Sequence, residues 1–299
     1  MEFEPMNLSE SKLVRRVAET FRLVRRGPQP FIPGADDVYL ASYPRSGNTW
    51  LAATIAEIMF GTSGETLDDI RRYVPDIHKQ PAAEDVHPAP FHVVKTHEPC
   101  GYSKRSKYTR VVYILRDPRD VALSFYRYLV GRNDYEGTLD DFLMAWLAGR
   151  IWPSSWGEHV NSWTCPWGKK PLAHVEVFRY EDLVAAPAQQ FREVSRLLGY
   201  DLNAGRLEEI VRRTGPAEMR RKEQSAIAQG SSAAGNAPFI GQARAGAWRD
   251  SLTASQEAMI TARLREPMER FGYVHRGTWP PAADQGQYDL KSIPSAAAG

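Results

Sequence analysis

The chain has 299 residues, of which 42% are hydrophobic and 25% charged, a composition typical of globular proteins that excludes a wholly disordered or fibrous chain. Its 38 basic and 36 acidic residues leave a net charge of +2, which gives no indication of a nucleic-acid partner. The two cysteines, Cys100 and Cys165, are too few for a disulfide framework or a cysteine-based zinc site. No apolar run reaches the ~18–20 residues of a membrane span, and the acidic, polar stretch 1–10 is unlike a signal peptide. We therefore expect a cytoplasmic protein without a membrane span.

Residues 1–35 are expected to form an N-terminal helix and a linker. A basic amphipathic pattern predicts the helix at 8–26, and Gly27-Pro28 ends it because proline cannot continue a helix.

From residue 36 on, strand signals alternate with helix signals. Short β-rich runs predict strands at 38–42, 91–94, 110–115 and 175–178. Apolar and amphipathic runs predict helices at 49–60, 118–130, 187–198 and 207–213. This alternation predicts an α/β fold with a central parallel sheet and helices on both faces.

Two segments lack a packing pattern. Residues 222–245 contain the small-residue run Gln-Gly-Ser-Ser-Ala-Ala-Gly-Asn-Ala, which is typical of a mobile segment. We expect it to act as a lid, because it lies between motifs that bear chemistry. The tail at 278–299 is expected to be disordered.

The most informative motif is the loop 42–50, Ser-Tyr-Pro-Arg-Ser-Gly-Asn-Thr-Trp, between the first strand and its helix. Its spacing is that of the phosphate-binding loop G-x-x-x-x-G-K-[ST], with Ser42 in place of the first glycine and Asn48 in place of the lysine. Backbone N–H groups at a helix start still form an anion cradle. Arg45 can add a fixed positive charge and Thr49 a hydroxyl. The missing lysine argues against an ordinary ATPase or kinase, in which it reaches the β- and γ-phosphates.

Two further motifs follow predicted strands. Arg116 begins Arg-Asp-Pro-Arg-Asp at a strand end, where ligands collect in open α/β sheets, and Ser124 lies in the following helix. The two residues converge on one phosphate only if the Asp-Pro turn folds the helix back. Val-Val-Lys-Thr-His at 93–97 is a strand running into a loop at the same edge. His97, with Lys95 beside it, is the candidate general base, because histidine titrates near neutral pH.

Together these motifs resemble the sulfotransferases that use 3′-phosphoadenosine 5′-phosphosulfate (PAPS), the cytosolic-type family and its bacterial relatives. The family's Tyr-Pro-Lys-Ser-Gly-x-Thr-Trp is matched at 43–50, its Lys-Thr-His at 95–97 and its Arg-[Asn/Asp]-Pro-[Lys/Arg]-Asp-x-x-x-Ser at 116–124. Its Ser-Trp-x-x-His-Val is echoed at 155–160 and its Tyr-Glu-Asp at 180–182. The resemblance implies a sulfotransferase domain at 36–277 with a P-loop-like phosphosulfate-binding loop.

The resemblance implies a role for each matched residue. The catalytic residues would be His97, Lys95 and Arg45: the histidine takes the acceptor's proton, and the two cations stabilise the sulfuryl oxygens and the departing phosphate. The PAPS-binding residues would be Arg45, Ser46, Gly47, Asn48, Thr49, Trp50, Arg116, Ser124, Tyr180, Thr214, Arg244 and Gly246. PAPS would be a co-substrate that leaves as adenosine 3′,5′-bisphosphate. We expect no metal, because this donor has no β- and γ-phosphates for Mg²⁺ to bridge.

Two family segments are altered in this chain. Where the family has a phenylalanine that stacks on adenine, the segment 214–219 has Pro216. The family's Arg-Lys-Gly is Gly-Gln-Ala at 241–243, and Arg244 is the candidate for the displaced charge.

The acceptor is expected to be a small molecule, and its class stays open. Five of the eight tryptophans fall close together, at Trp146, Trp152, Trp156, Trp163 and Trp167. We expect about half of them to pack in the core and the others to form a pocket for a flat, apolar acceptor. The nearby acidic residues fit a cationic or polar acceptor instead; they are Asp134, Glu136, Asp140 and Asp141.

Two other functions remain as alternatives. One is a P-loop kinase of nucleosides or small metabolites, which Asn48 weakens. The other is a nucleotide-binding scaffold without activity, against which the intact Lys95, His97, Arg116 and Ser124 argue. The family's dimerisation pattern has alanine in its Val and Glu positions, so a homodimer is possible and the oligomeric state stays open.

Overall fold

The computed structural model describes residues 29–101, 109–165, 174–230, 240 and 244–275. The helix expected at 8–26, the tail at 278–299 and Trp167 lie outside the described residues.

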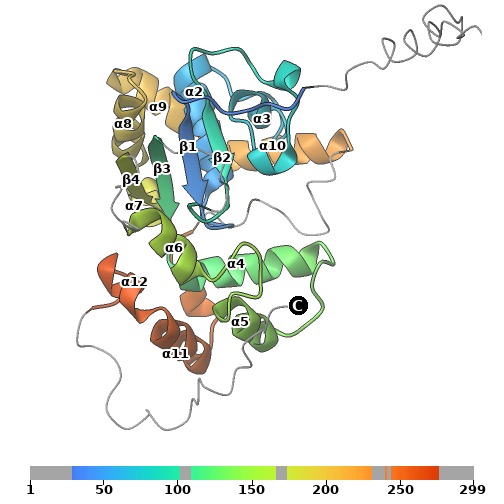
Figure 1. Cartoon of the computed structure of the whole chain (residues 1–299), viewed down its shortest axis with the longest axis vertical. Helices are drawn as coiled ribbons and strands as arrows, with labels where there is room; N and C mark the ends of the chain where they lie inside the picture. Colours follow the sequence, from blue (N-terminus) through green and yellow to red (C-terminus); the bar gives the residue numbers. More distant parts are fainter. Residues whose placement is uncertain (1–28, 102–108, 166–173, 231–239, 241–243, 276–299) are drawn as a thin grey trace, which may run out of the picture.

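Strands and helices alternate along the chain as the sequence predicts (Figure 1). The strands are β1 (Val38–Ser42), β2 (Val93–Thr96), β3 (Arg110–Leu115) and β4 (His174–Arg179). The α-helices are α2 (Asn48–Phe60), α3 (Ile70–Tyr73), α4 (Pro118–Gly131), α5 (Leu139–Leu147), α6 (Trp156–Thr164), α7 (Tyr180–Ala185), α8 (Pro187–Leu197), α9 (Ala204–Thr214), α10 (Pro216–Ala228), α11 (Ala254–Arg263) and α12 (Arg265–Arg270). Short 3-10 helices are η2 (Ile77–Lys79), η3 (Ala83–Asp85) and η4 (Ala247–Asp250). The strand expected at 91–94 begins later, so Lys95 belongs to β2 and His97 directly follows it.

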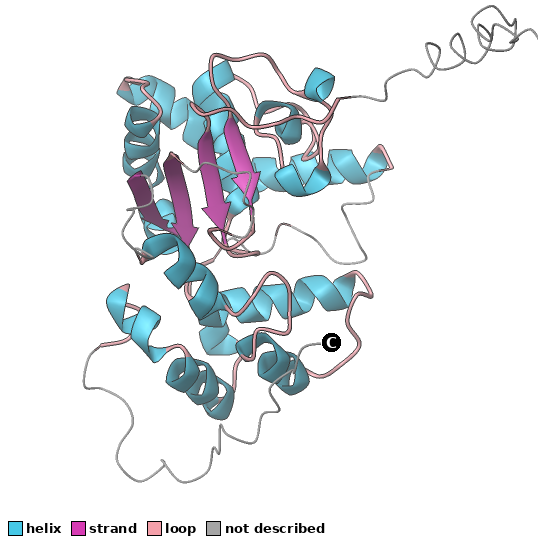
Figure 2. Cartoon of the chain, viewed as in Figure 1, coloured by secondary structure: helices cyan, strands magenta, loops and turns pink. Residues whose placement is uncertain are grey.

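The four strands form one parallel sheet in the order β2-β1-β3-β4 (Figure 2). β1 is buried along its whole length and β3 everywhere except at Arg110, as expected for parallel strands covered on both faces. Because the strands are parallel, their carboxyl ends meet at one edge of the sheet. The loops that carry the three motifs all begin at this edge, which confirms the predicted α/β class and positions the motifs as neighbours.

Alternate side chains of the strands pack into two separate cores. One core packs Leu40 and Ile114 against α2, α8 and α9. The other packs Tyr39 and Tyr113 against α4, α5, α6, α11 and α12, so helices cover both faces. This second core also buries three of the clustered tryptophans, Trp146, Trp156 and Trp163. For these three, the packing role expected of about half of the cluster is confirmed.

The segment 222–245, expected to lack packing, is partly helical. Its first residues belong to α10, in which Lys222 and Glu223 are buried. The carboxylate of Glu223 accepts a hydrogen bond from the N–H of Ile240 (3.1 Å). The prediction is therefore wrong for 222–228, because buried polar side chains with partners leave no apolar pattern in the sequence. Most of the remaining segment lies outside the described residues, and the lid there stays a prediction.

Arg119 joins the first turn of α4 to the C-terminal helices. Its guanidinium donates to the carboxylates of Asp117 (2.8 Å) and Glu257 (2.9 Å). It also donates to the carbonyl of Tyr273 (3.1 Å) and lies over the ring of Trp248, 3.8 Å from the centroid. The side chains of Arg119 and Asp117 are 7% and 8% exposed, so this ion pair is largely removed from water, whereas Glu257 is 37% exposed.

We expect the substitution Arg119→Met to destabilise the fold by about 3–5 kcal/mol, because it leaves the carboxylate of Asp117 buried without its partner. Urea unfolding measures this loss. The matched control is Arg196→Met on α8, whose pair with Glu193 is more than half exposed and contributes at most about 1 kcal/mol. A loss no larger than that of the control would show that the buried network contributes little to stability.

Candidate active site

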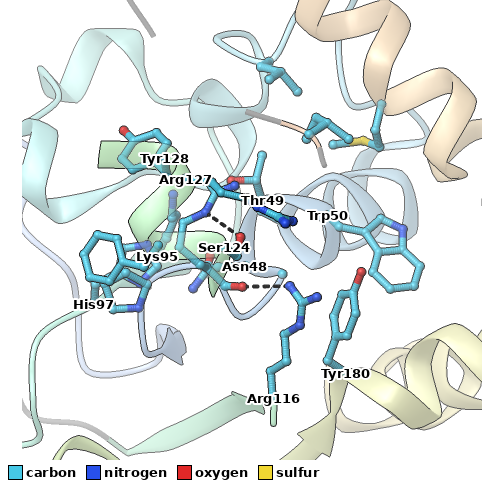
Figure 3. A pocket seen from close by; sticks show the side chains of 18 of the residues that line it. Asn48, Thr49, Trp50, Lys95, His97, Arg116, Ser124, Arg127, Tyr128 and Tyr180 are labelled. Atoms are coloured by element: carbon cyan, nitrogen blue, oxygen red, sulfur yellow. Dashed lines mark hydrogen bonds between the residues drawn. The ribbon is translucent and has the colours of Figure 1, made fainter. Parts of the chain in front are cut away.

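A cleft of about 1830 Å³ opens at the carboxyl edge of the sheet (Figure 3). It lies among the loop between β1 and α2, the end of β2, the helix α4 and the start of α7. The sequence-predicted residues in its lining are Arg45, Gly47, Asn48, Thr49, Trp50, Lys95, His97, Arg116, Ser124, Tyr180 and Arg244. The fold thus brings three distant motifs together around one space.

The loop between β1 and α2 requires glycine at position 47 for two reasons. Gly47 has a φ of +102°, in the left-handed region, and a Cβ there would lie 2.8 Å from the ring of Tyr180. Tyr180 thereby sits against the start of α2, with its ring edge-on to that of Trp50 at 5.9 Å between centroids. The neighbouring Ser46 is not in the cleft lining. Its hydroxyl is buried and has no hydrogen-bond partner within the described ranges.

Asn48, which replaces the lysine of ordinary phosphate loops, directs its side-chain amide back toward the sheet. Its Nδ2 donates to the carbonyl of Leu40 (3.3 Å) and to the hydroxyl of Ser42 (3.0 Å). The amide therefore ties the first turn of α2 to the end of β1. If Asn48 donates a hydrogen bond to a bound anion, the donor must therefore be its backbone N–H.

Arg45 connects the phosphate loop with the motif at 116–124. Its Nε donates to Oγ of Ser124 (3.2 Å), and its carbonyl accepts from Nη1 of Arg116 (3.1 Å). Figure 3 labels Ser124 and Arg116, which lie on the same side of the cleft. The guanidinium of Arg45 also lies over the ring of Tyr128, 4.7 Å from its centroid. Burial lowers the pKa of Arg45 to about 10, so the side chain is still cationic at neutral pH. Arg116 and Ser124 thus converge through Arg45.

Arg116 is held between α7 and the segment before η4. Its guanidinium lies over the ring of Tyr180, 4.2 Å from the centroid, and Nη2 donates to the carbonyl of Arg244 (3.2 Å). The side chain of Arg244 lines the cleft and is paired with Asp250. The guanidinium of Arg244 is thus already paired with a carboxylate on this side of the cleft, and its role toward the cofactor stays a prediction.

Besides Ser46, two other predicted cofactor-binding residues do not line the cleft. Thr214 is completely buried, and its hydroxyl donates to the carbonyl of Ile210 (2.8 Å) within α9. The N–H of Gly246 donates to the carboxylate of Asp120 (2.7 Å). Both groups are already engaged with the protein, and their assignment to the cofactor stays a prediction.

The ring of His97 is oriented by the end of β1. Its Nδ1 lies 2.8 Å from the carbonyl of Ser42, so this nitrogen carries the proton and donates it. Nε2 is then the unprotonated nitrogen. Burial and the charge of Lys95 lower the pKa of His97 to about 3, so the imidazole is neutral at neutral pH. The cleft therefore contains a neutral imidazole whose Nε2 retains its lone pair.

Lys95 is paired with Asp76, a residue that the sequence did not single out. The Nζ and Oδ2 atoms lie 3.3 Å apart, and both side chains are largely buried. Burial lowers the pKa of Lys95. Burial acts to raise the pKa of Asp76, but Lys95, His97 and His78 together outweigh it, and the pKa of Asp76 is lowered. The pair holds the ammonium beside His97.

Two further histidines hold the backbone of His97. Its N–H donates to Nε2 of His78 (2.8 Å), and its carbonyl accepts from Nε2 of His159 (3.1 Å). Nδ1 of His159 in turn accepts from the hydroxyl of Tyr113 (2.9 Å), and burial lowers the pKa of His159 to about 3. His159 belongs to the echoed Ser-Trp-x-x-His-Val motif, which was the available signal. His78 belongs to none of the matched motifs.

Trp152 forms the aromatic wall next to the two histidines. It is 54% exposed, lines the cleft, and packs edge-on against His78 (5.2 Å) and His97 (6.3 Å between centroids). Lys79 and Arg150 line this end as well. The acidic residues that the sequence offers for a cationic acceptor are not in the lining of the cleft; they are Asp134, Glu136, Asp140 and Asp141. That alternative therefore has no support from the cleft.

Within the described residues, no group of three His, Cys, Asp or Glu side chains is arranged to hold a metal ion. Among the helices of that same part of the chain, none combines the length and the apolar side chains needed to span a membrane.

Comparison with known proteins finds sulfotransferases among the relatives of this chain. The family model for the sulfotransferase domain matches residues 35–272. Sulfotransferase 1A1 of Rattus norvegicus is 26% identical over 274 residues, or 86% of this chain and 91% of that protein, and sulfotransferase 1B1 of Mus musculus is 24% identical over 250 residues, or 78% and 82%.

Solved structures give the same result. The crystal structure of mouse sulfotransferase SULT7A1 complexed with PAP has 25% identity and a TM-score of 0.57, covering 79% of this chain and 87% of that one. Retinol dehydratase in complex with androsterone and the inactive cofactor PAP has a TM-score of 0.62 and 18% identity, covering 78% and 80%, and indicates a shared fold.

The neutral, buried His159 predicts a loss of stability in acid. Because its pKa is lowered on folding from an ordinary value of about 6.5, the unfolded chain binds the proton first, and stability falls as the pH decreases from about 6.5 toward about 3. The variant His159→Gln can still donate to His97 and cannot be protonated. We expect it to remove on the order of 2 kcal/mol of the decrease between about pH 7 and about pH 4.5, measured by urea unfolding.

The control for this prediction is His174→Gln, because the side chain of His174 is 72% exposed. It should leave the pH dependence as it is in the wild type. The same steep decrease in His159→Gln would contradict a neutral His159.

Proposed function

The chain belongs to the sulfotransferase family and is a PAPS-dependent sulfotransferase, and we propose that it transfers the sulfuryl group to a hydroxyl or amine of a small molecule with His97 as the general base. The observation that carries this proposal is the orientation of His97, whose Nδ1 is bonded to Ser42 and whose Nε2 is unprotonated in the cleft. PAPS supplies the activated sulfuryl group. The residues of the chain must bind it, align the acceptor and take up one proton.

His97 is suited to take the proton from the acceptor. A general base must be unprotonated when the acceptor arrives, and the lowered pKa of His97 keeps it so at neutral pH. When Nε2 gains the proton, the imidazolium is stabilised by the carbonyl of Ser42 and by the nearby carboxylate of Asp76. The positive charge of Lys95 opposes protonation of His97. Negative charge on the deprotonating acceptor or on the sulfuryl oxygens would offset the charge of Lys95.

The cleft fits a nucleotide that carries several phosphate groups. Nε of Arg116 and Nε1 of Trp50 are buried donors without a hydrogen-bond partner in the described chain, and such donors are rarely left unsatisfied. The N-terminus of α2, with Gly47 and Thr49, would hold the 5′-phosphosulfate. Arg116 and Ser124 would hold the 3′-phosphate, and Trp50 and Tyr180 would flank the adenine.

Arg45 and Lys95 would stabilise the charge that develops on the leaving phosphate and on the sulfuryl oxygens. Both cations are largely buried, where such interactions are stronger than in water. Arg45 stays protonated at neutral pH, so its role is to donate hydrogen bonds and not a proton.

The kinase alternative is disfavoured by the direction of the Asn48 side chain. A kinase of this type needs a cation that reaches the β- and γ-phosphates, whereas the amide of Asn48 is bonded to Leu40 and Ser42. The scaffold alternative is disfavoured by the oriented His97 and Lys95. An acceptor with an aromatic ring is supported by the exposed face of Trp152 beside His97.

We expect adenosine 3′,5′-bisphosphate to bind without metal, in preference to Mg·ATP, in a calorimetric titration. Arg116→Ala should weaken this binding about 10- to 100-fold, because a hydrogen bond to a charged group contributes about 1.5–3 kcal/mol. The matched control is Arg110→Ala at the opposite end of β3, which should leave the Kd within about twofold. Preferential binding of Mg·ATP would contradict the sulfotransferase proposal and favour the kinase alternative.

We expect His97→Ala to lower kcat by about 10²–10⁴-fold with PAPS and 4-nitrophenol as the probe acceptor, because the general base is removed. The Kd of adenosine 3′,5′-bisphosphate should stay within about threefold of the wild type. The exposed His174→Ala serves as the control variant. If His97→Ala retained the turnover of the wild type, His97 would not be the base.

A further inference from the structure

The turn at 75–79 lies along the outer edge of β2. Because β2 is the edge strand of the sheet, its outward N–H and C=O groups need partners from elsewhere. The carbonyl of Pro75 accepts from the N–H of Lys95 (2.8 Å), and Asp76 forms a parallel bridge with Lys95. The turn thus extends the sheet by one short pairing and is fixed relative to the residues that end β2.

His78, in the same turn, contacts His97 directly. Its Nε2 accepts the hydrogen bond from the backbone N–H of His97 (2.8 Å), and the two rings are parallel within 9°, with centroids 6.1 Å apart. The carboxylate of Asp76 accepts from the N–H of His78 (3.0 Å), and Trp152 packs against both rings. Because a backbone N–H can only donate, Nε2 of His78 must be unprotonated.

We propose that His78 is a positioning residue for His97, because the hydrogen bond it accepts fixes the backbone from which the imidazole of His97 projects toward the acceptor. This inference rests on the general-base role proposed above for His97. His78 itself need not touch the reacting atoms. Without the contact, the backbone N–H of His97 loses its partner and this stretch of backbone can shift relative to the Ser42 carbonyl that holds Nδ1. A displacement of about 1 Å can lower turnover about 10²-fold.

The contact also depends on the charge of His78. Within the described residues, five charged or titratable groups face His78. Its own turn contributes Asp76 and Lys79, and β2 with the two residues after it contributes Lys95, His97 and Glu98. Burial lowers the pKa of His78, and Asp76 and Glu98 oppose this shift. In acid, a protonated His78 turns Nε2 into a donor that faces another donor. The hydrogen bond to His97 is then lost.

Two variants separate the acceptor atom from the ring. His78→Phe keeps a ring next to His97 and removes the acceptor, whereas His78→Gln places Oε1 where Nε2 was and cannot titrate. By NMR, we expect the amide of His97 to exchange with solvent at least about tenfold faster in His78→Phe and to be restored in His78→Gln. In the wild type, this amide signal should move with pH as His78 titrates, and in His78→Gln this movement should disappear. The control is His174→Phe.

Turnover gives the functional arm of the test. With PAPS and 4-nitrophenol, His78→Phe should lower kcat about 10- to 100-fold, with the Kd of adenosine 3′,5′-bisphosphate within about twofold. His78→Gln should recover most of this loss and remain active at lower pH than the wild type. An unchanged His97 amide in His78→Phe, or a loss of kcat that His78→Gln does not recover, overturns the proposal. If the wild type does not use 4-nitrophenol at all, that result concerns the proposed function. The exchange of the His97 amide, measured by NMR, then tests the positioning role of His78.

Discussion

The hydrogen bond from Nδ1 of His97 to the carbonyl of Ser42 is the contact on which the rest of the active site depends. Ser42 is the last residue of β1, and its hydroxyl also accepts from Asn48 at the start of α2. One strand end therefore orients both His97, the proposed base, and the phosphate loop. Group transfer between two bound molecules requires this kind of alignment, because most of the catalytic gain comes from holding the reacting atoms in register.

The cations around the cleft are oriented by uncharged groups and by carboxylates together. Arg45 is held by the hydroxyl of Ser124 and the ring of Tyr128. Arg116 is held by two carbonyls and the ring of Tyr180, and it also lies 3.8 Å from the buried carboxylate of Asp120. Contacts with uncharged groups fix a guanidinium while leaving much of its positive charge for a ligand. The charge of Lys95 is likewise balanced by a carboxylate, that of Asp76. The positive charge of Lys95 opposes protonation of the neighbouring His97, the proposed base. The negative charge of Asp76 reduces this opposition.

Much of the architecture could be predicted because the relevant signals are local. The run 110–115 is short, β-branched and apolar, which in a parallel sheet means burial on both faces, and the structure has this strand at those residues. The loop 42–50 could be assigned from spacing, since a helix start offers N–H groups whatever side chains surround it. The sequence indicates less about polar side chains, because each of them can choose among several hydrogen-bond partners. Thr214 bonds within its own helix, and Lys222 and Glu223 are buried in a stretch that reads as polar.

The sequence by itself determined the α/β class, the order of the elements and the identity of His97, Lys95, Arg45, Arg116 and Ser124 as candidates, because periodicity and motif spacing are properties of neighbouring residues. The tertiary structure alone decided which atoms of these residues face each other. Asp76 and His78 come from a turn that no motif marks, and they meet Lys95 and His97 only because that turn pairs with the outer edge of β2. The tautomer of His97 was likewise set by a carbonyl 55 positions away, and contacts over such distances follow from strand order, which is not written in any local pattern.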